Sequence, residues 1–238
     1  RNWPHNMHMI NPRRAAKLTA KLIAGSTVLV AVAAAAQMFP RTRTISVTDF
    51  HRIRVLGPFV IDVKTGKSPT ARTSGSPQAL DRISVTQQGQ MLIIRPASGV
   101  LGGAGKPVEP ARLSLTVPML RGISVEGTGA VVVDKMKGQT LKLGITGAGA
   151  LTVGALDTDM LDLSLQGAGT GTLGGQARKA LVYGRGTATL NATALKVNDL
   201  EMTWQSAGNS EIAANRTAKL IATGAGGVAI TGKATCAV

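Results

Sequence analysis

Residues 145–153 read ITGAGALTV and residues 165–173 read LQGAGTGTL. Each stretch has a corner of small residues, Gly-x-Gly, with apolar and polar residues alternating on both sides. The pattern occurs six times, and the second glycine of the corner recurs after 20, 20, 17, 22 and 18 residues. A period near 20 is typical of a β-solenoid, because one coil can bury its apolar face only against the next coil. The six corners are Gly127-Thr128-Gly129, Gly147-Ala148-Gly149, Gly167-Ala168-Gly169, Gly184-Arg185-Gly186, Ser206-Ala207-Gly208 and Gly224-Ala225-Gly226.

The alternation around the corners predicts strands with one buried face, since side chains point to opposite faces with a period of two. The column two residues before the corner holds Val125, Ile145, Leu165, Tyr183 (with one intervening residue absent), Trp204 and Ala222. The column two residues further back holds Ile123, Leu143, Leu163, Leu181, Met202 and Leu220. We therefore predict an all-β fold, a β-helix or β-solenoid with about 20 residues per coil.

The second corner position is glycine in all six repeats, whereas the first is serine once. A tight reversal commonly needs a positive φ angle, which glycine adopts at almost no cost. We therefore assign this backbone requirement to the second position. The structural corner glycines are Gly129, Gly149, Gly169, Gly186, Gly208 and Gly226.

The rest of the chain suggests three parts. Residues 45–110 read as a smaller N-terminal β-region with a glycine- and proline-rich linker, and residues 111–238 as the solenoid. The strands expected in the first region are Ile45–Val47, Ile53–Val55, Phe59–Val63, Ile83–Val85 and Met91–Ile94. Cys236 is the only cysteine, and an odd thiol near the end of an exported chain suggests that the solenoid is truncated at its C-terminus.

Residues 1–36 read as a signal peptide. Arginines and lysines precede an uncharged stretch from Leu22 to Ala36 that ends in small residues. We expect cleavage after Ala36. The alternative is an uncleaved anchor from Leu22 to Phe39, just long enough to span a membrane with strain. Export implies the periplasm, the outer membrane surface or the extracellular space.

The formal net charge is +15, and residues 1–43 contribute seven basic and no acidic side chains. The remainder has 20 basic and 12 acidic residues, a net charge of +8. Such an excess can attract anionic envelope polysaccharide or lipid head groups, with Lys135 and Lys137 as candidate contacts; it also suits a merely solvated surface. Nucleic acid is disfavoured, because no aromatic residues are interleaved with the basic ones.

Catalytic chemistry finds little support in the sequence. After residue 36 the one histidine is His51, without a plausible nucleophile beside it. Asp157, Asp159 and Asp162 form the only local acidic cluster; it offers oxygen ligands for Ca²⁺, but it is better explained as a solvated turn. We therefore predict no catalytic residues, no metal site and no cofactor.

Three stretches carry a resemblance to a known family: residues 50–63 (FHRIRVLGPFVIDV), residues 80–85 (LDRISV) and residues 115–129 (LTVPMLRGISVEGTG). In order and spacing they resemble the auto-transporter adhesin head domain, or GIN domain, of bacterial envelope proteins. The resemblance covers about residues 45–236 and implies an exported β-helical protein with an adhesive role. It brings no catalytic residues.

Together these observations predict a non-enzymatic envelope protein whose solenoid surface binds polysaccharide or another protein. Two other classes remain open at this point. One is a β-helix enzyme acting on acidic polysaccharide, which needs acids and a base converging on one sheet face. The other is a structural subunit that stacks end to end through its open coil. The oligomeric state cannot be read from the sequence.

Overall fold

The computed structural model describes residues 41–98 and 109–237. The predicted signal peptide, residues 1–36, and most of the predicted linker lie outside the described residues. Residues 38–238 form one compact unit. In chain order the described elements are β1 (Arg41–Ile45), β2 (Arg52–Leu56), β3 (Val60–Thr65), β4 (Thr70–Gly75), α1 (Pro77–Asp81), β5 (Ile83–Gln88), β6 (Met91–Pro96), β7 (Arg112–Val117), β8 (Gly122–Gly127), β9 (Ala130–Gly147), β10 (Ala150–Gly167), β11 (Thr170–Gly186), β12 (Thr189–Ser206), β13 (Ser210–Ala222), β14 (Val228–Gly232) and β15 (Thr235–Ala237).

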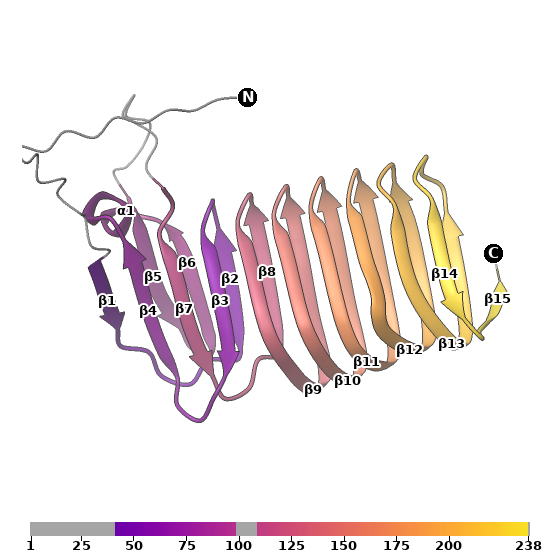
Figure 1. Cartoon of the computed structure of the whole chain (residues 1–238), viewed down its shortest axis with the longest axis horizontal. Coiled ribbons are helices and arrows are strands. Elements are labelled where there is room, and N and C mark those ends of the chain that lie inside the picture. Colours follow the sequence, from indigo (N-terminus) through magenta and orange to yellow (C-terminus); the bar gives the residue numbers. More distant parts are fainter. Residues whose placement is uncertain (1–40, 99–108, 238) are drawn as a thin grey trace, which may run out of the picture. The chain divides into compact units, whose positions relative to one another are not determined.

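The strands stack into two layers, because each of the long strands bends midway and contributes to both (Figure 1). The first half of β9 pairs with β3, and its second half pairs with β8. We call the layer that contains β3 and β14 the first layer, and the layer that contains β2, β8 and β15 the second layer. The predicted all-β solenoid is therefore confirmed.

Adjacent coils are parallel and in register. Val131 lies opposite Leu151 in the first layer, and Leu143 lies opposite Leu163 in the second. These side chains point inward and are almost fully buried. The 20-residue offset between partners is the period predicted from the sequence.

The corners differ from the prediction in which glycine carries the positive φ angle. Gly127, Gly147 and Gly167, at the first corner position, have φ values of +105°, +110° and +104°. Among the second-position glycines assigned above, Gly186 alone is in this region, with φ +98°. Pairing places Gly186 opposite Gly167, so Gly186 also belongs to the first position. The assignment of a positive φ to Gly129, Gly149, Gly169, Gly208 and Gly226 was wrong.

The second position favours a residue with little or no side chain for a different reason, which is space. A Cβ on Gly149 would lie 2.7 Å from Cγ1 of Val125 and 2.9 Å from the carbonyl oxygen of Gly129. In the fourth coil Ala188 occupies this position and is fully buried. The second position is thus limited by packing against the previous coil.

The fourth corner is Gly186-Thr187-Ala188, two residues later than the sequence indicated. First-position residues 127, 147, 167, 186, 206 and 224 are then evenly spaced, by 18 to 20 residues. The shift moves two side chains from the expected core to the outside. Val182 and Gly184 point inward in this coil, while Leu181 and Tyr183 point outward. Trp204 of the next coil fills the space beside Gly184, where a Cβ would overlap the indole ring.

Residues 45–110 do not form a separate β-region. Strands β2 and β3 make a coil of the solenoid, with a corner at Gly57 (φ +107°) and Ile61 opposite Val131. Strands β6 and β7 add a further coil by pairing in parallel with β2 and β3. The expected boundary at residue 110 therefore falls within one stack. The sequence pattern missed the coil of β2 and β3 because its corner, Gly57-Pro58-Phe59, lacks the Gly-x-Gly form of the other coils.

Antiparallel strands cover the N-terminal end of the stack. β4 pairs with β7, β1 pairs with β4, and β5 pairs with β6, all antiparallel. The strand expected at Ile45–Val47 instead ends at Ile45, and β4 was not expected. The short helix α1, also unexpected, begins after Ser76, whose Oγ accepts a hydrogen bond from the Ala79 N–H.

Within the described residues, no helix has the length and apolar character that crossing a membrane requires.

Candidate anion-binding groove

A groove of about 1340 Å³ lies beside residues 118–121, which connect β7 in the first layer to β8 in the second. Side chains from β2, β8, the bend of β9 and the bend of β10 line it. Six of the lining residues are basic and two are acidic. The basic residues are Arg52, Arg54, Arg121, Lys135, Lys137 and Lys142, and the acidic ones are Asp157 and Asp159.

Two cations flank a buried glycine on the floor of the groove. Arg52, Gly122 and Lys142 are register partners on the adjacent strands β2, β8 and β9. Because strands are spaced by about 4.8 Å, the backbones of Arg52 and Lys142 lie roughly 10 Å apart. Because Gly122 has no side chain, the stem of Arg52 packs against it: a Cβ on Gly122 would lie 3.4 Å from Arg52 Cγ. An anion bound beside this glycine could contact both Arg52 and Lys142.

Hydrogen bonds fix the connection that forms one wall of the groove. The His51 carbonyl accepts hydrogen bonds from the N–H groups of Arg121 (2.8 Å) and Gly122 (3.2 Å). His51 Nδ1 lies 3.1 Å from the carbonyl oxygen of Met119, and Arg121 Nε donates to Met119 Sδ at 3.3 Å. His51 therefore positions this wall, and Arg121 is one of the residues that line the groove.

Lys135 and Lys137, the two contacts predicted from the sequence, both line this groove. They lie in the bend of β9. Lys137 Nζ forms an ion pair with Asp157 Oδ2 at 2.9 Å. Hydrogen bonds from Lys137 and Gln176 lower the pKa of Asp157 below its usual value. Lys137 is thus partly neutralised, whereas Lys135 has no ion pair among the described residues.

Arg54 is neutralised more completely. Its Nε and Nη2 donate to the two carboxylate oxygens of Glu126 at 2.7 Å and 3.1 Å. The hydrogen bond from Arg54 lowers the pKa of Glu126, against the opposing effect of burial, and the same bond raises the pKa of Arg54. Among the described residues, Arg52, Arg121, Lys135 and Lys142 are the lining cations without an ion pair.

The acidic cluster of the sequence is dispersed in the structure. Asp157 pairs with Lys137, and Asp159 Oδ1 accepts a hydrogen bond from Arg178 Nε at 2.7 Å. Asp162 lies further along β10, on the outer face of the second layer. These carboxylates do not converge on one point. Within the described ranges no three His, Cys, Asp or Glu side chains are grouped to hold a metal ion.

Sequence reasoning missed Arg52, Arg121 and Lys142. These residues belong to separate segments that meet only because β2 stacks on β8 out of chain order. The repeat does align Lys142 with Gly122, one coil earlier. The charge of Arg52-Ile53-Arg54 marks this segment as a candidate for anion binding. The residues that lie beside it can be identified only from the pairing of β2 with β8.

Several solved structures share this fold. A crystal structure described as a putative adhesin from Bacteroides fragilis is 19% identical, covers 83% of this chain and 96% of its own, and superposes with a TM-score of 0.70. A putative adhesin from Parabacteroides merdae is 17% identical over 83% and 95%, with a TM-score of 0.60. A putative lipid binding protein from Parabacteroides distasonis is 16% identical over 83% and 95%, with a TM-score of 0.58.

At these identities the solved structures show a shared fold. Among curated proteins none matches the chain significantly. The family model described as "Putative auto-transporter adhesin, head GIN domain" matches residues 49–234, and the chain therefore belongs to this family.

Proposed function

We propose that this protein is an exported, non-enzymatic adhesion protein of the bacterial envelope that binds an anionic polysaccharide in the basic groove. The adhesin family supports a surface or envelope role. The proposal of export rests on the signal-like sequence of residues 1–36. The alternative, an enzyme that degrades the same polysaccharide, would shorten the polymer chain. The proposal therefore includes that an acidic polysaccharide keeps its chain length after incubation with the protein.

The observation that carries the proposal is the arrangement of Arg52 and Lys142 on both sides of Gly122, with Arg121 beside them. Carboxylate and sulfate groups bind such cations through charge-assisted hydrogen bonds. A groove of about 1340 Å³ has room for several sugar units of a polymer. Exposed charges contribute little individually, so affinity for a polymer comes from several contacts at once.

Binding of polygalacturonate, measured by calorimetry at about 20 and 300 mM salt, tests this proposal. The triple variant Arg52→Gln, Arg121→Gln and Lys142→Gln should weaken binding about tenfold or more at low salt. A control triple removes three exposed charges elsewhere: Arg185→Gln, Lys196→Gln and Lys233→Gln. It should change affinity less than about threefold.

The single change Lys135→Gln should weaken binding more than Lys137→Gln, because Lys137 already shares its charge with Asp157. Equal losses in the groove triple and the control triple would mean that only net charge matters. Binding that ignores salt, or none at either salt concentration, would exclude the groove as an anionic polymer site.

A further inference from the structure

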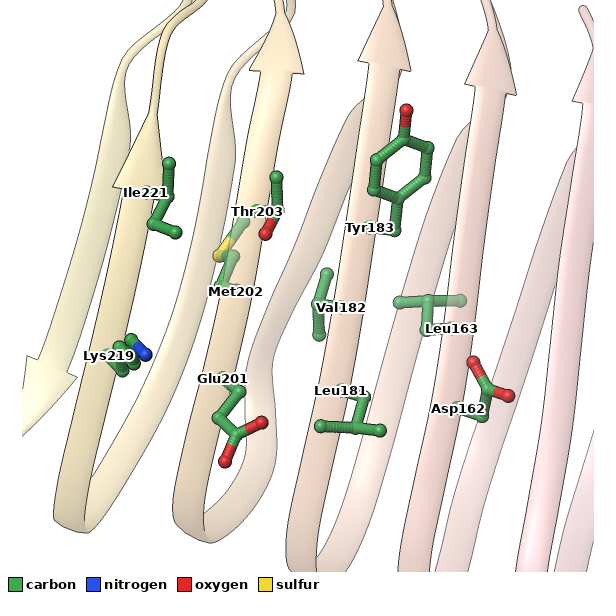
Figure 2. A pocket seen from close by; sticks show the side chains of 10 residues that line it. All are labelled: Asp162, Leu163, Leu181, Val182, Tyr183, Glu201, Met202, Thr203, Lys219 and Ile221. Atoms are coloured by element: carbon green, nitrogen blue, oxygen red, sulfur yellow. The ribbon is translucent and has the colours of Figure 1, made fainter.

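A second hollow, of about 270 Å³, lies on the outer face of the second layer over strands β10 to β13 (Figure 2). Two rows of outward side chains shape it. Register pairs place Asp162, Leu181, Glu201 and Lys219 in one row, and Ser164, Tyr183, Thr203 and Ile221 in the other. The hollow is therefore built by four successive coils and is distinct from the basic groove.

Tyr183 supplies an aromatic surface in this hollow. It is the only tyrosine of the 238 residues, and its ring turns one face toward the open side (Figure 2). On the two sides of Tyr183 in the strand, Val182 and Gly184 point inward. Trp204 packs beside Gly184, and its Nε1 donates to the Gly208 carbonyl at 2.9 Å. The sheet beneath Tyr183 is thus held by a fully buried tryptophan.

Polar groups surround the aromatic ring. Lys179 Nζ donates to Glu201 Oε1 at 2.8 Å, which orients this carboxylate and leaves its second oxygen able to accept hydrogen bonds. Asp162 and Lys219 lie in the row of Glu201, and Thr203 is the register partner of Tyr183 (Figure 2). The hollow thereby combines one apolar face with acceptors and donors at its edge.

The same two rows have a different character in earlier coils. On strands β2, β8 and β9 the first row holds Arg52, Gly122 and Lys142. The second row holds Arg54, Ser124 and Gly144 on the same strands. Over strands β10 to β13 the rows instead carry Leu181, Tyr183 and Ile221, and Ile221 is 51% exposed. Here the apolar side chains are grouped in one hollow beside polar groups, which is typical of a binding surface.

We propose that this hollow binds one neutral pyranose unit of an oligosaccharide, stacked on Tyr183. A sugar ring has C–H groups on its faces and hydroxyl groups at its rim. The electron-rich face of tyrosine attracts the polarised C–H groups. Glu201 and Asp162 accept from hydroxyl groups, while Thr203 and Lys219 donate. This site goes beyond the anionic site of the proposed function and does not depend on it.

Size and charge select this ligand class. Pockets for drug-sized ligands measure about 300–1,000 Å³, so a volume of 270 Å³ suits one ring rather than a folded segment. Lys179 and Lys219 balance the charges of Asp162 and Glu201, so the hollow has no net positive charge to hold a uronic acid. A lipid chain would leave both carboxylates without hydrogen bonds from the ligand.

Because the chain has a single tyrosine, labelling tyrosine with ¹³C gives one ring signal that reports this site. We would titrate the labelled protein with cellohexaose, maltohexaose, mannohexaose and galactohexaose in about 300 mM salt, which screens the basic groove. At least one of these should shift the Tyr183 signal saturably. Calorimetry with that sugar should show that Tyr183→Ala weakens binding about fivefold or more and that Tyr183→Phe changes it less than about twofold.

Val132→Ala is the matched control, because Val132 is also an exposed apolar residue, 45% exposed, but lies in the first layer. It should leave affinity unchanged, as should the groove triple variant. If none of the four sugars shifts the signal, or if Tyr183→Ala binds as tightly as Val132→Ala, the saccharide site is wrong. Loss of sugar binding in the groove triple alone would place the sugar in the groove and overturn the hollow, whatever polygalacturonate does.

Discussion

The coils formed by β9 to β13 and the coil formed by β2 and β3 have the same local geometry but a different chain order. Gly57 and Gly147 both turn the chain at their corners, with φ +107° and +110°. Ile61 is the parallel register partner of Val131, and Val131 is in turn the parallel register partner of Leu151 in the next coil. In the later coils each strand follows its predecessor directly, whereas residues 66–121 separate β3 from β8.

This difference separates two kinds of surface. Where the order is regular, outward rows are built by register alone, as in the hollow around Tyr183. Where the order is interrupted, the connection at residues 118–121 forms a wall that a regular coil does not have, and the basic groove lies against it. The comparison indicates that an interruption can add a binding groove without changing the interior of the stack.

The largest expected effect is at a corner of the regular coils. Gly147→Val should lower the free energy of unfolding by about 4 kcal/mol, since the valine must adopt a positive φ and clash with the backbone below. A Cβ there would lie 2.8 Å from the carbonyl oxygen of Gly127. Gly149→Val, which has the packing conflict alone, should cost less, about 3 kcal/mol. Urea unfolding measures both.

Gln166→Val is the control, because it introduces the same side chain at an exposed position next to the third corner. It should remain within about 0.5 kcal/mol of the unmodified protein. If Gly147→Val unfolds at the same urea concentration as Gln166→Val, the corner geometry described above is incorrect.

The sequence predicts the regular coils well, because their corners and alternation are local. It fails at the fourth corner for a physical reason. Gly184 and Gly186 form a Gly-x-Gly triplet, but Gly184 is glycine to make room for Trp204, while the true second position is Ala188. A glycine required by a neighbouring coil therefore imitates a glycine required by a turn. This error placed Tyr183 in the core.

The candidate site is only partly accessible to sequence reasoning. Lys135 and Lys137 stand out as two lysines in one polar bend. Arg52 and Lys142 are separated by 90 positions and become neighbours across Gly122 only when β2 stacks on β8. Nothing local encodes that contact, since the first coil has Gly57-Pro58-Phe59 at its corner.

The next prediction tests whether the interrupted coil belongs to the same cooperative unit. Ile61→Ala in β3 and Leu151→Ala in β10 each remove a fully buried side chain from the first layer. Each should cost about 2–4 kcal/mol and shift a single unfolding transition. Urea unfolding followed by circular dichroism and by tryptophan fluorescence, which reports the exposure of the buried Trp204, should give coincident curves for both variants. An early separate phase in Ile61→Ala alone would restore an independent N-terminal region.

The smallest effect concerns an exposed ion pair between the last long strands. Hydrogen bonds from Arg216 and Thr217 lower the pKa of Asp199 from 3.8 to about 2. A carboxyl whose folded pKa is lowered contributes stability above its unfolded pKa, and this contribution is lost as the pH falls toward the folded value. The window is therefore between about pH 4 and pH 2.

Comparing Asp199→Asn with the unmodified protein isolates this contribution. At pH 7 the variant should unfold at a temperature lower by no more than about 2 °C, because exposed ion pairs are weak and screened. The difference should shrink below pH 4, be mostly lost near pH 2, where the folded carboxyl is half protonated, and vanish at still lower pH. Asp62→Asn, on the interrupted coil, removes one exposed carboxylate that has no ion pair among the described residues. If Asp199→Asn and Asp62→Asn lose the same stability at pH 7, the ion pair does not distinguish the regular coils from the interrupted coil. If the Asp199→Asn difference persists unchanged at pH 2, Asp199 does not stabilise the protein through its pair with Arg216.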